Sequence, residues 1–123
     1  MARTIFIQSM CALLLWAITL PLHATTALTE KAKIEALIAN LESKTDATFI
    51  RNGREYNSKD AAKFLRGKWQ AYEKQIKTAD DFIAKAATVS STTGKPYLIR
   101  FKGAAEIRCG DHLTAQLKKL KAE

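Results

Sequence analysis

The sequence predicts an α+β fold of about four helices packed on two small antiparallel β-hairpins, preceded by a cleavable signal peptide. Three observations predict it. Four segments repeat apolar residues at helical spacing, two shorter segments alternate around the turns at Asn52-Gly53 and Gly103, and the N-terminal segment is mostly apolar. Helical repeats bury one stripe of a helix and alternation buries one face of a strand, so both kinds of element can share one core.

The N-terminal segment has the layout of a secretory signal peptide. Arg3 supplies a positive start, residues 5–20 are mostly apolar, Pro21 breaks the segment, and the small Ala24 offers a cleavage point. The apolar run is short for a membrane span, and no charged stop-transfer flank follows it. We therefore expect residues 1–24 to be removed. Residues 25–123 then form one small α+β domain, exported to the periplasm without a membrane span.

The composition is basic and poor in thiols and imidazoles. The net charge is +8, and loss of Arg3 leaves +7. Such a charge is compatible with an anionic ligand or an acidic partner. It is equally normal for a solvated surface, and it does not indicate specific nucleic-acid binding. Beyond residue 24 the only cysteine is Cys109 and the only histidine is His112, so we expect no intramolecular disulfide, no metal site of the Cys/His kind and no cofactor.

Residues 29–44 are expected to form the first helix. Thr29 can accept a hydrogen bond at its N-terminus. The positions at i, i+3, i+4 and i+7 of one face are apolar: Ile34, Leu37, Ile38 and Leu41. The opposite face is charged, so the helix packs one side on a core.

The next segment switches to strand-like spacing around Asn52-Gly53. This dipeptide is a strong hairpin signal because a type I′ turn needs positive φ at both central positions. A two-residue turn there places Phe49 opposite Tyr56 and Arg51 opposite Arg54, with all four side chains on one face. Like charges directly opposed destabilise a strand pair, so the two guanidiniums are either separated in water or held near an anion.

The second helix is expected to run from a cap at Asn57 or Ser58 to about Lys77. Its apolar residues recur at helical spacing: Ala61, Leu65, Trp69, Tyr72 and Ile76. Thr78 and Asp81 form a capping box, so a third helix begins there. Its buried side has four members: Phe82, Ile83, Ala86 and Ala87.

The hydroxyl-rich segment that leads into Gly94 and Lys95 has the chemistry of a phosphate-binding P-loop. A P-loop, however, runs from strand to glycine-rich loop to helix, whereas this segment lies between a helix and a strand. Val89 stands where a P-loop has its first glycine, and Pro96 follows the lysine in place of Ser or Thr. We therefore expect residues 90–96 to be a polar connection, with extended backbone just before Pro96.

A second hairpin and a last helix complete the fold. Gly103 lies in a three-residue loop, and the resulting register sets Arg100 against Glu106, a charge match. The same register puts Cys109 on the face of Tyr97. The last helix begins just after this strand, and three leucines face the core: Leu113, Leu117 and Leu120.

Cys109 and His112 suggest one alternative function, that of a cysteine-dependent enzyme or redox protein. A helix N-terminus lowers the pKa of a thiol, and a histidine one turn away could act as its base. The predicted register, however, buries Cys109 among aromatic and aliphatic neighbours, where a thiol is inert. The sequence indicates no base for Ser90 or Ser91 and no paired carboxylates of the glycosidase kind. We therefore predict no catalytic residues.

Four short motifs follow one another along the chain: FIRNG at 49–53, LRGK at 65–68, TADDFI at 78–83 and SSxxGKxY at 90–97. In this order and spacing they resemble the YfeK-like family, small exported bacterial proteins of unassigned function. The resemblance implies an export signal and a single compact domain. It implies no activity, cofactor or catalytic residue.

These motifs supply the candidate ligand-binding residues, which combine positive charge with polar donors: Arg51, Asn52, Arg66, Lys68, Ser90, Ser91, Gly94, Lys95 and Tyr97. If the hairpin turn and the serine loop lie close together, the set forms a basic polar patch able to recognise an anionic group. We predict a non-enzymatic binding or interaction module whose partner is an anionic ligand or another envelope protein. A further alternative is an inhibitor or stabiliser of another exported protein.

Overall fold

The structure, a computed structural model, describes residues 28–122, so the predicted signal peptide over residues 1–24 lies outside the described residues. Its elements follow in the order α1 (Glu30–Ser43), β1 (Thr48–Arg51), β2 (Arg54–Asn57), α2 (Ser58–Ala71), η1 (Glu73–Gln75), α3 (Ala79–Phe82), η2 (Ile83–Ala87), β3 (Leu98–Arg100), β4 (Glu106–Arg108) and α4 (Cys109–Ala122). The predicted α+β fold is confirmed. Within the described range, no helix has the length and apolar character needed to cross a membrane.

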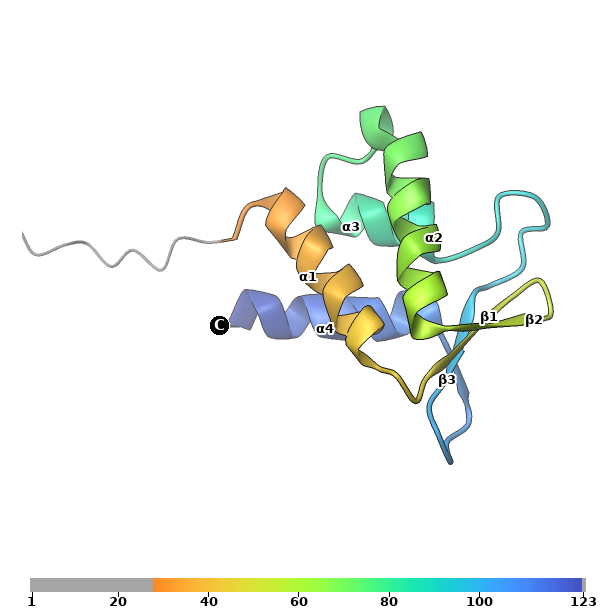
Figure 1. Ribbon diagram of the computed structural model, residues 1–123. Helices are drawn as coiled ribbons and strands as arrows, with labels where there is room; N and C mark the ends of the chain where they lie inside the picture. Colours follow the sequence, from red (N-terminus) through yellow and green to blue (C-terminus); the bar gives the residue numbers. More distant parts are fainter. Residues whose placement is uncertain (1–27, 123) are drawn as a thin grey trace, which may run out of the picture.

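The two hairpins join into one antiparallel sheet with the strand order β2-β1-β3-β4 (Figure 1). Phe49 of β1 lies opposite Tyr56 of β2 and opposite Ile99 of β3. Both predicted hairpin registers are confirmed, because Arg100 also lies opposite Glu106. Since β1 and β3 run in opposite directions, the turn that follows β1 lies beside the loop that precedes β3, and both are at the right of Figure 1.

The first turn has the geometry that its sequence predicts. Asn52 and Gly53 have φ angles of 51° and 76°, so both central residues adopt the left-handed conformation. A type I′ turn requires this pair of angles, and its twist matches the twist of the flanking strands. The turn therefore fixes the register in which Arg51 faces Arg54.

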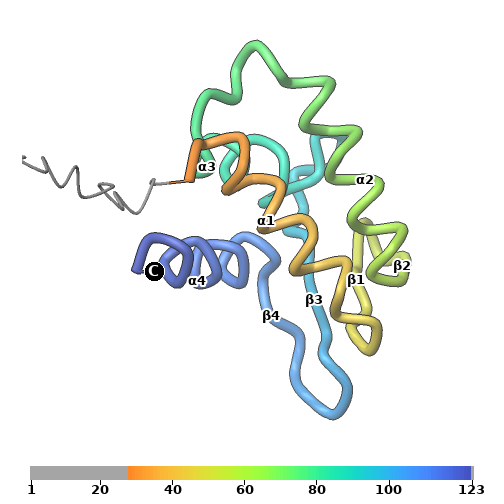
Figure 2. Tube along the Cα trace, turned by 60° about the vertical axis from the view of Figure 1, so that its left-hand side comes forward, coloured from red at the N-terminus to blue at the C-terminus, as the bar shows by residue number. Residues whose placement is uncertain are grey.

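Helices cover one face of the sheet and α1 is central among them. Figure 2 shows α1 between α2 and α4, and it packs against both. Phe49 and Ile99 are buried on the covered face. On the other face Arg100 pairs with Glu55 at 2.6 Å and with Glu106 at 3.4 Å. The sheet thus has apolar core residues on its covered face and a cluster of ion pairs on the other face.

The core collects the predicted apolar residues: Ile34, Leu37, Ile38 and Leu41 of α1, Ala61 and Leu65 of α2, Phe82, Ile83, Ala86 and Ala87 of α3 and η2, and Leu113 and Leu117 of α4. Trp69, Tyr72 and Leu120 are half-buried and pack against this core. Burial of these side chains provides most of the driving force for folding.

The prediction that the second helix reaches Lys77 is wrong, since α2 ends at Ala71. The apolar spacing does continue to Ile76, which is buried, but Ile76 reaches the core from extended backbone with φ −103° and ψ 101°. The cause lies in the next helix. Thr78 must be extended, with φ −128° and ψ 163°, to cap α3, so the chain has to leave α2 earlier.

The start of α3 is held by two carboxylates. The predicted capping box is present: the Thr78 hydroxyl accepts a hydrogen bond from the Asp81 amide, and the Asp81 carboxylate accepts from the Thr78 amide. Glu30 of α1 accepts from the amide of Ala79 at 2.8 Å. This last hydrogen bond lowers the pKa of Glu30. The same contacts therefore satisfy the first amides of α3 and tie that helix to α1.

Replacement of Thr78 by alanine tests the cap. We expect Thr78→Ala to lower the free energy of unfolding by about 1 kcal/mol, because the Asp81 amide loses the hydroxyl that accepts its hydrogen bond. Thr45→Ala, in an exposed turn, is the matched control and should change the free energy by less than about 0.5 kcal/mol. Urea unfolding followed by circular dichroism measures both. Equal losses in the two variants would contradict the role of the capping box.

Candidate functional site

The first hairpin turn and the serine loop over residues 90–96 are in contact. The side-chain amide of Asn52 donates to the hydroxyl of Ser90 at 3.2 Å, and the hydroxyl of Thr93 donates to the Asn52 carbonyl oxygen at 2.6 Å. One side chain of the turn therefore joins two points of the loop. The structure thus brings together the two segments that the candidate binding set requires to be adjacent.

The serine loop is also held by its own hydrogen bonds. The buried Ser90 hydroxyl accepts from the amides of Thr92 and Thr93 at 3.3 and 3.4 Å, and the carbonyl of Ser90 accepts from the amide of Gly94 at 2.9 Å. Gly94 has a φ of 71°, which favours glycine. Ser90 and Gly94 therefore shape the loop, while Lys95 extends from it as an exposed side chain.

Lys68 is a largely buried cation on α2, with only 9% of its surface exposed. Its Nζ donates to the hydroxyl of Tyr97 at 3.0 Å and to the carbonyl of Val89 at 3.2 Å. No carboxylate within residues 28–122 forms an ion pair with it. Burial lowers the pKa of Lys68, and the positive charge of Arg51 lowers it further. An ammonium group has three protons, so one remains to be donated.

Arg51 is the second cation near this point. Its guanidinium carbon lies 4.2 Å from the centre of the Phe64 ring and 5.8 Å from that of Tyr56. An arginine over an aromatic face is held by cation–π attraction. The ion pairs of the described chain include Arg66 and Arg100, but not Arg51. Its planar donors therefore stay available for a ligand.

A groove of about 380 Å³ lies between α2 and the serine loop. Its lining consists of Phe64, Gly67, Lys68 and Ala71 of α2, Tyr72 directly after that helix, residues 90–92 of the loop, and Arg51 and Tyr97. The hydroxyl of Tyr72 donates to the hydroxyl of Ser91 at 3.0 Å and links the two walls. The groove therefore combines two cations and several hydroxyls with an aromatic surface.

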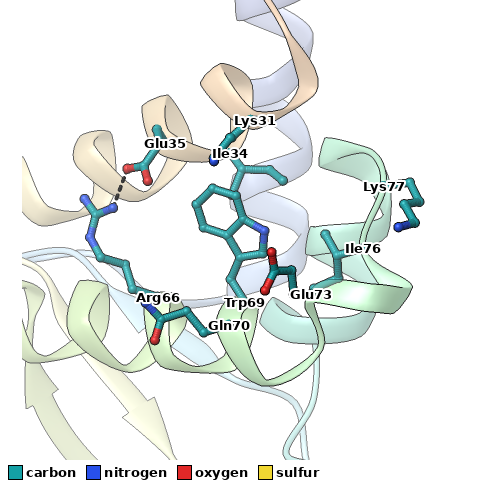
Figure 3. Close-up of a pocket in the computed structure, with 9 residues that line it drawn as sticks. All are labelled: Lys31, Ile34, Glu35, Arg66, Trp69, Gln70, Glu73, Ile76 and Lys77. Carbon is teal, nitrogen blue, oxygen red and sulfur yellow. Dashed lines mark hydrogen bonds and ion pairs between the residues drawn. The ribbon is translucent and has the colours of Figure 1, made fainter.

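Arg66 is separated from this groove because it lies on the other side of α2. It pairs with the carboxylate of Glu35 on α1 (Figure 3). Its guanidinium also lies 3.9 Å from the carboxylate of Glu42 on the same helix. This side has a larger hollow of about 500 Å³, into which Trp69 projects (Figure 3). Its charges alternate in sign, and Arg66 is already neutralised. We therefore place the candidate site at the smaller groove, where the cations are not neutralised.

The groove includes residues that the sequence did not indicate as ligand-binding: Phe64, Gly67, Ala71, Tyr72 and Thr92. The helical members share a signal that could have found them. Positions three and four residues apart lie on one face of a helix, and Lys68 was already a candidate. The same rule would have removed Arg66, which is two residues from Lys68.

The surroundings of Cys109 do not favour a nucleophile. The side chain is fully buried, and this burial raises the pKa of the thiol to about 12. The amide of Cys109 donates to the carbonyl of Tyr97 at 2.8 Å, which fixes the start of α4 beside β3. His112 packs against Phe101, with ring centres 5.2 Å apart, and burial lowers its pKa. A thiolate is therefore strongly disfavoured at this position.

Alkylation measures this directly. We expect the peptide that contains Cys109 to remain unmodified when the folded protein meets iodoacetamide at about pH 8.5, the ordinary pKa of a thiol. The same peptide should react fully in guanidinium chloride, where the thiol is exposed. Mass spectrometry of the digested protein gives both extents. Modification of the folded protein at a rate within about tenfold of the unfolded rate would contradict the burial argument.

Fold and groove together define a small basic α+β protein with a polar groove on one side of α2. Residues 28–121 match the family described as "Family of unknown function (DUF5329)", and the chain belongs to this family. It is similar to "Uncharacterized protein YfeK" of Salmonella typhimurium (strain LT2), with 42% identity over 87 residues that cover 71% of this chain and 72% of that protein. The resemblance to the YfeK-like family is therefore confirmed. No solved structure matches the chain.

Proposed function

We propose that this protein is an exported, non-enzymatic binding module whose groove between α2 and the serine loop takes an anionic group. The observation that carries the proposal is the pair formed by Lys68 and Arg51, two cations that line one groove without a carboxylate partner in the described chain. Buried charges in proteins are normally paired, because desolvation of a lone charge costs free energy. A bound anion would supply the missing partner.

The low exposure of Lys68 determines how much free energy is gained when such an anion binds. At about 4 Å a pair of unit charges gains about 1 kcal/mol in bulk water, and about 4 kcal/mol at the effective dielectric of about 20 that suits a site near a protein surface. Because only 9% of the Lys68 surface is exposed, the second figure describes this residue better. The positive charge of Arg51 adds a second favourable electrostatic interaction with the anion. The groove can therefore bind a single anionic group without a large interface.

Hydroxyl groups at the rim supply further donors. The Ser91 hydroxyl accepts a hydrogen bond from Tyr72, so its own proton is free to be donated. Lys68 has one proton left after its bonds to Val89 and Tyr97. Hydrogen bonds to a charged acceptor are shorter and stronger than neutral ones. An anion in the groove would therefore be held by directed contacts as well as by charge.

The sequence also predicts two alternative functions, a cysteine-dependent enzyme and an inhibitor or stabiliser of another protein, and the structure bears on them differently. The enzyme alternative requires a reactive Cys109, whose thiol is buried. Inhibition or stabilisation of another exported protein is compatible with this groove, because the carboxylate of a partner's acidic side chain has the same chemistry as a small anion. That alternative stays a prediction.

Two arginines of the first hairpin provide a matched test. Arg51 lines the groove, whereas its strand partner Arg54 is exposed outside it. We expect acetate, benzoate or inorganic phosphate to give saturable shifts of the amide signals of residues 90–93 in nuclear magnetic resonance spectra. Arg51→Gln should weaken this binding at least about tenfold, the loss of about 1.4 kcal/mol expected for one charged hydrogen bond.

Arg54→Gln is the control, because it removes the same charge from the same hairpin. It should bind the anions as the unaltered protein does. Equal weakening by both substitutions would mean that only net charge matters. Absence of saturable shifts in the unaltered protein with all three anions, and with glucuronate as a fourth, would contradict the proposed function.

The pH dependence of binding tests Lys68 independently. An anion binds the protonated ammonium group, whose pKa in the folded protein lies below the ordinary value of 10.5. Affinity should therefore be constant near neutral pH and should fall as the pH rises through the lowered pKa towards 10.5. Arg51 stays charged over this window and cannot cause the fall. Titration of benzoate between about pH 6 and pH 10.5 measures it, and constant affinity throughout would exclude Lys68 from the site.

A further inference from the structure

Gly67 is the one glycine of the chain whose presence neither a positive φ angle nor close packing explains. Of the five glycines, Gly53, Gly94 and Gly103 have positive φ angles, and Gly110 faces Thr88, whose hydroxyl would lie 2.9 Å from an added Cβ. Gly67 lies within α2 and has no positive φ, and no atom lies within 4 Å of the position of an added Cβ. Glycine is among the poorest residues for a helix interior. Neither backbone geometry nor packing therefore requires it.

The groove offers a reason. Gly67 lines it, in a row along α2 with Phe64 and Ala71, and Lys68 lies beside that row. Residues three and four apart share a helix face, so a side chain at position 67 would project over the groove between Phe64 and Ala71. Because it is absent, a ligand can approach the backbone of α2. The result is a flat, mainly apolar strip that leads to the cationic end.

The serine loop indicates which anion fits that end. Phosphate sites commonly use free backbone amides, as in glycine-rich loops and helix N-termini. Here the amides of residues 92–95 are already donated within the loop, to the Ser90 hydroxyl, the Ser90 carbonyl and the Thr93 hydroxyl. The remaining donors are the planar guanidinium of Arg51, one proton of Lys68, hydroxyls and the amide of Ser91, which is a single amide where a phosphate loop presents several. A planar carboxylate matches an arginine in a bidentate manner.

We propose that the ligand is a carboxylate carried on a six-membered ring, with the carboxylate at Lys68 and Arg51 and one face of the ring over Gly67. The inference rests on the proposed function and adds the chemical class of the ligand. A ring can lie on an exposed stretch of helix backbone, which a branched chain cannot do as closely. The groove volume of about 380 Å³ is within the range of about 300 to 1,000 Å³ that is usual for small-molecule sites. Aromatic acids and acidic sugars both have this chemistry.

The substitution Gly67→Ala separates stability from binding. Alanine is the better helix former, so the melting temperature should rise by about 2 to 8 °C. The added methyl group occupies the strip, so affinity for benzoate or glucuronate should fall at least about tenfold, whereas affinity for acetate, which has no ring, should change less than about twofold. A stabilised variant that loses binding cannot have lost it by unfolding. Gln70→Ala, which does not line the groove, should leave both affinities unchanged.

Each outcome has one meaning. Binding of benzoate alone identifies an aromatic acid, binding of glucuronate alone identifies an acidic sugar, and loss of either in Gly67→Ala supports the inference. If Gly67→Ala binds both ring acids as the unaltered protein does, or if inorganic phosphate binds more tightly than every carboxylate, the inference is wrong although the groove still binds anions. If neither acetate, benzoate, glucuronate nor phosphate binds the unaltered protein, the proposed function itself fails.

Discussion

The pairing of β1 with β3 is the constraint on which the rest of the structure depends. It sets Phe49 against Ile99 in the buried face of the sheet, and it connects two hairpins that lie far apart in the sequence. Because the two strands are antiparallel, it also places Asn52 beside Ser90. The groove has one wall from each half of the chain. Without this strand pair, the cations and the hydroxyl groups of the groove would not lie next to each other.

The two cations of the groove are held in place without being neutralised. Tyr97 and a backbone carbonyl accept hydrogen bonds from Lys68, and the Phe64 ring lies under Arg51. Arg66 and Arg100, in contrast, have carboxylates. Neutral acceptors and an aromatic face fix the direction of a cation but leave its charge unbalanced. This arrangement lowers the stability of the free protein in exchange for a site that is already formed.

Most of the fold could be predicted because its signals are local. Asn52-Gly53 determines a turn and hence a register, and Thr78 with Asp81 determines a helix start. The end of α2 was not predictable from its own residues, because it depends on the extended backbone that the next helix requires. In the same way, the apolar spacing correctly indicated burial of Ile76 but not the bend through which it is buried.

The site was only partly predictable, for a geometric reason. The sequence groups the residues of one short motif into one candidate set. Arg66 and Lys68, however, lie two positions apart on a helix and therefore point to different sides. In the sequence Tyr72 is one of the apolar positions of the second helix, because nothing in its spacing shows that the helix has a groove on one side. That information lies in the path of the serine loop, which is a matter of tertiary structure.

Asn52 has one further consequence. Glycine would satisfy the positive φ of this turn equally well, but only asparagine also binds the serine loop at two points. The loop is thereby tied to the hairpin at two points, which disfavours an outward swing of the loop as a flap. For the ligand that we propose, exchange with the surrounding solution would then be set by diffusion and residence time and not by a gating motion of this loop.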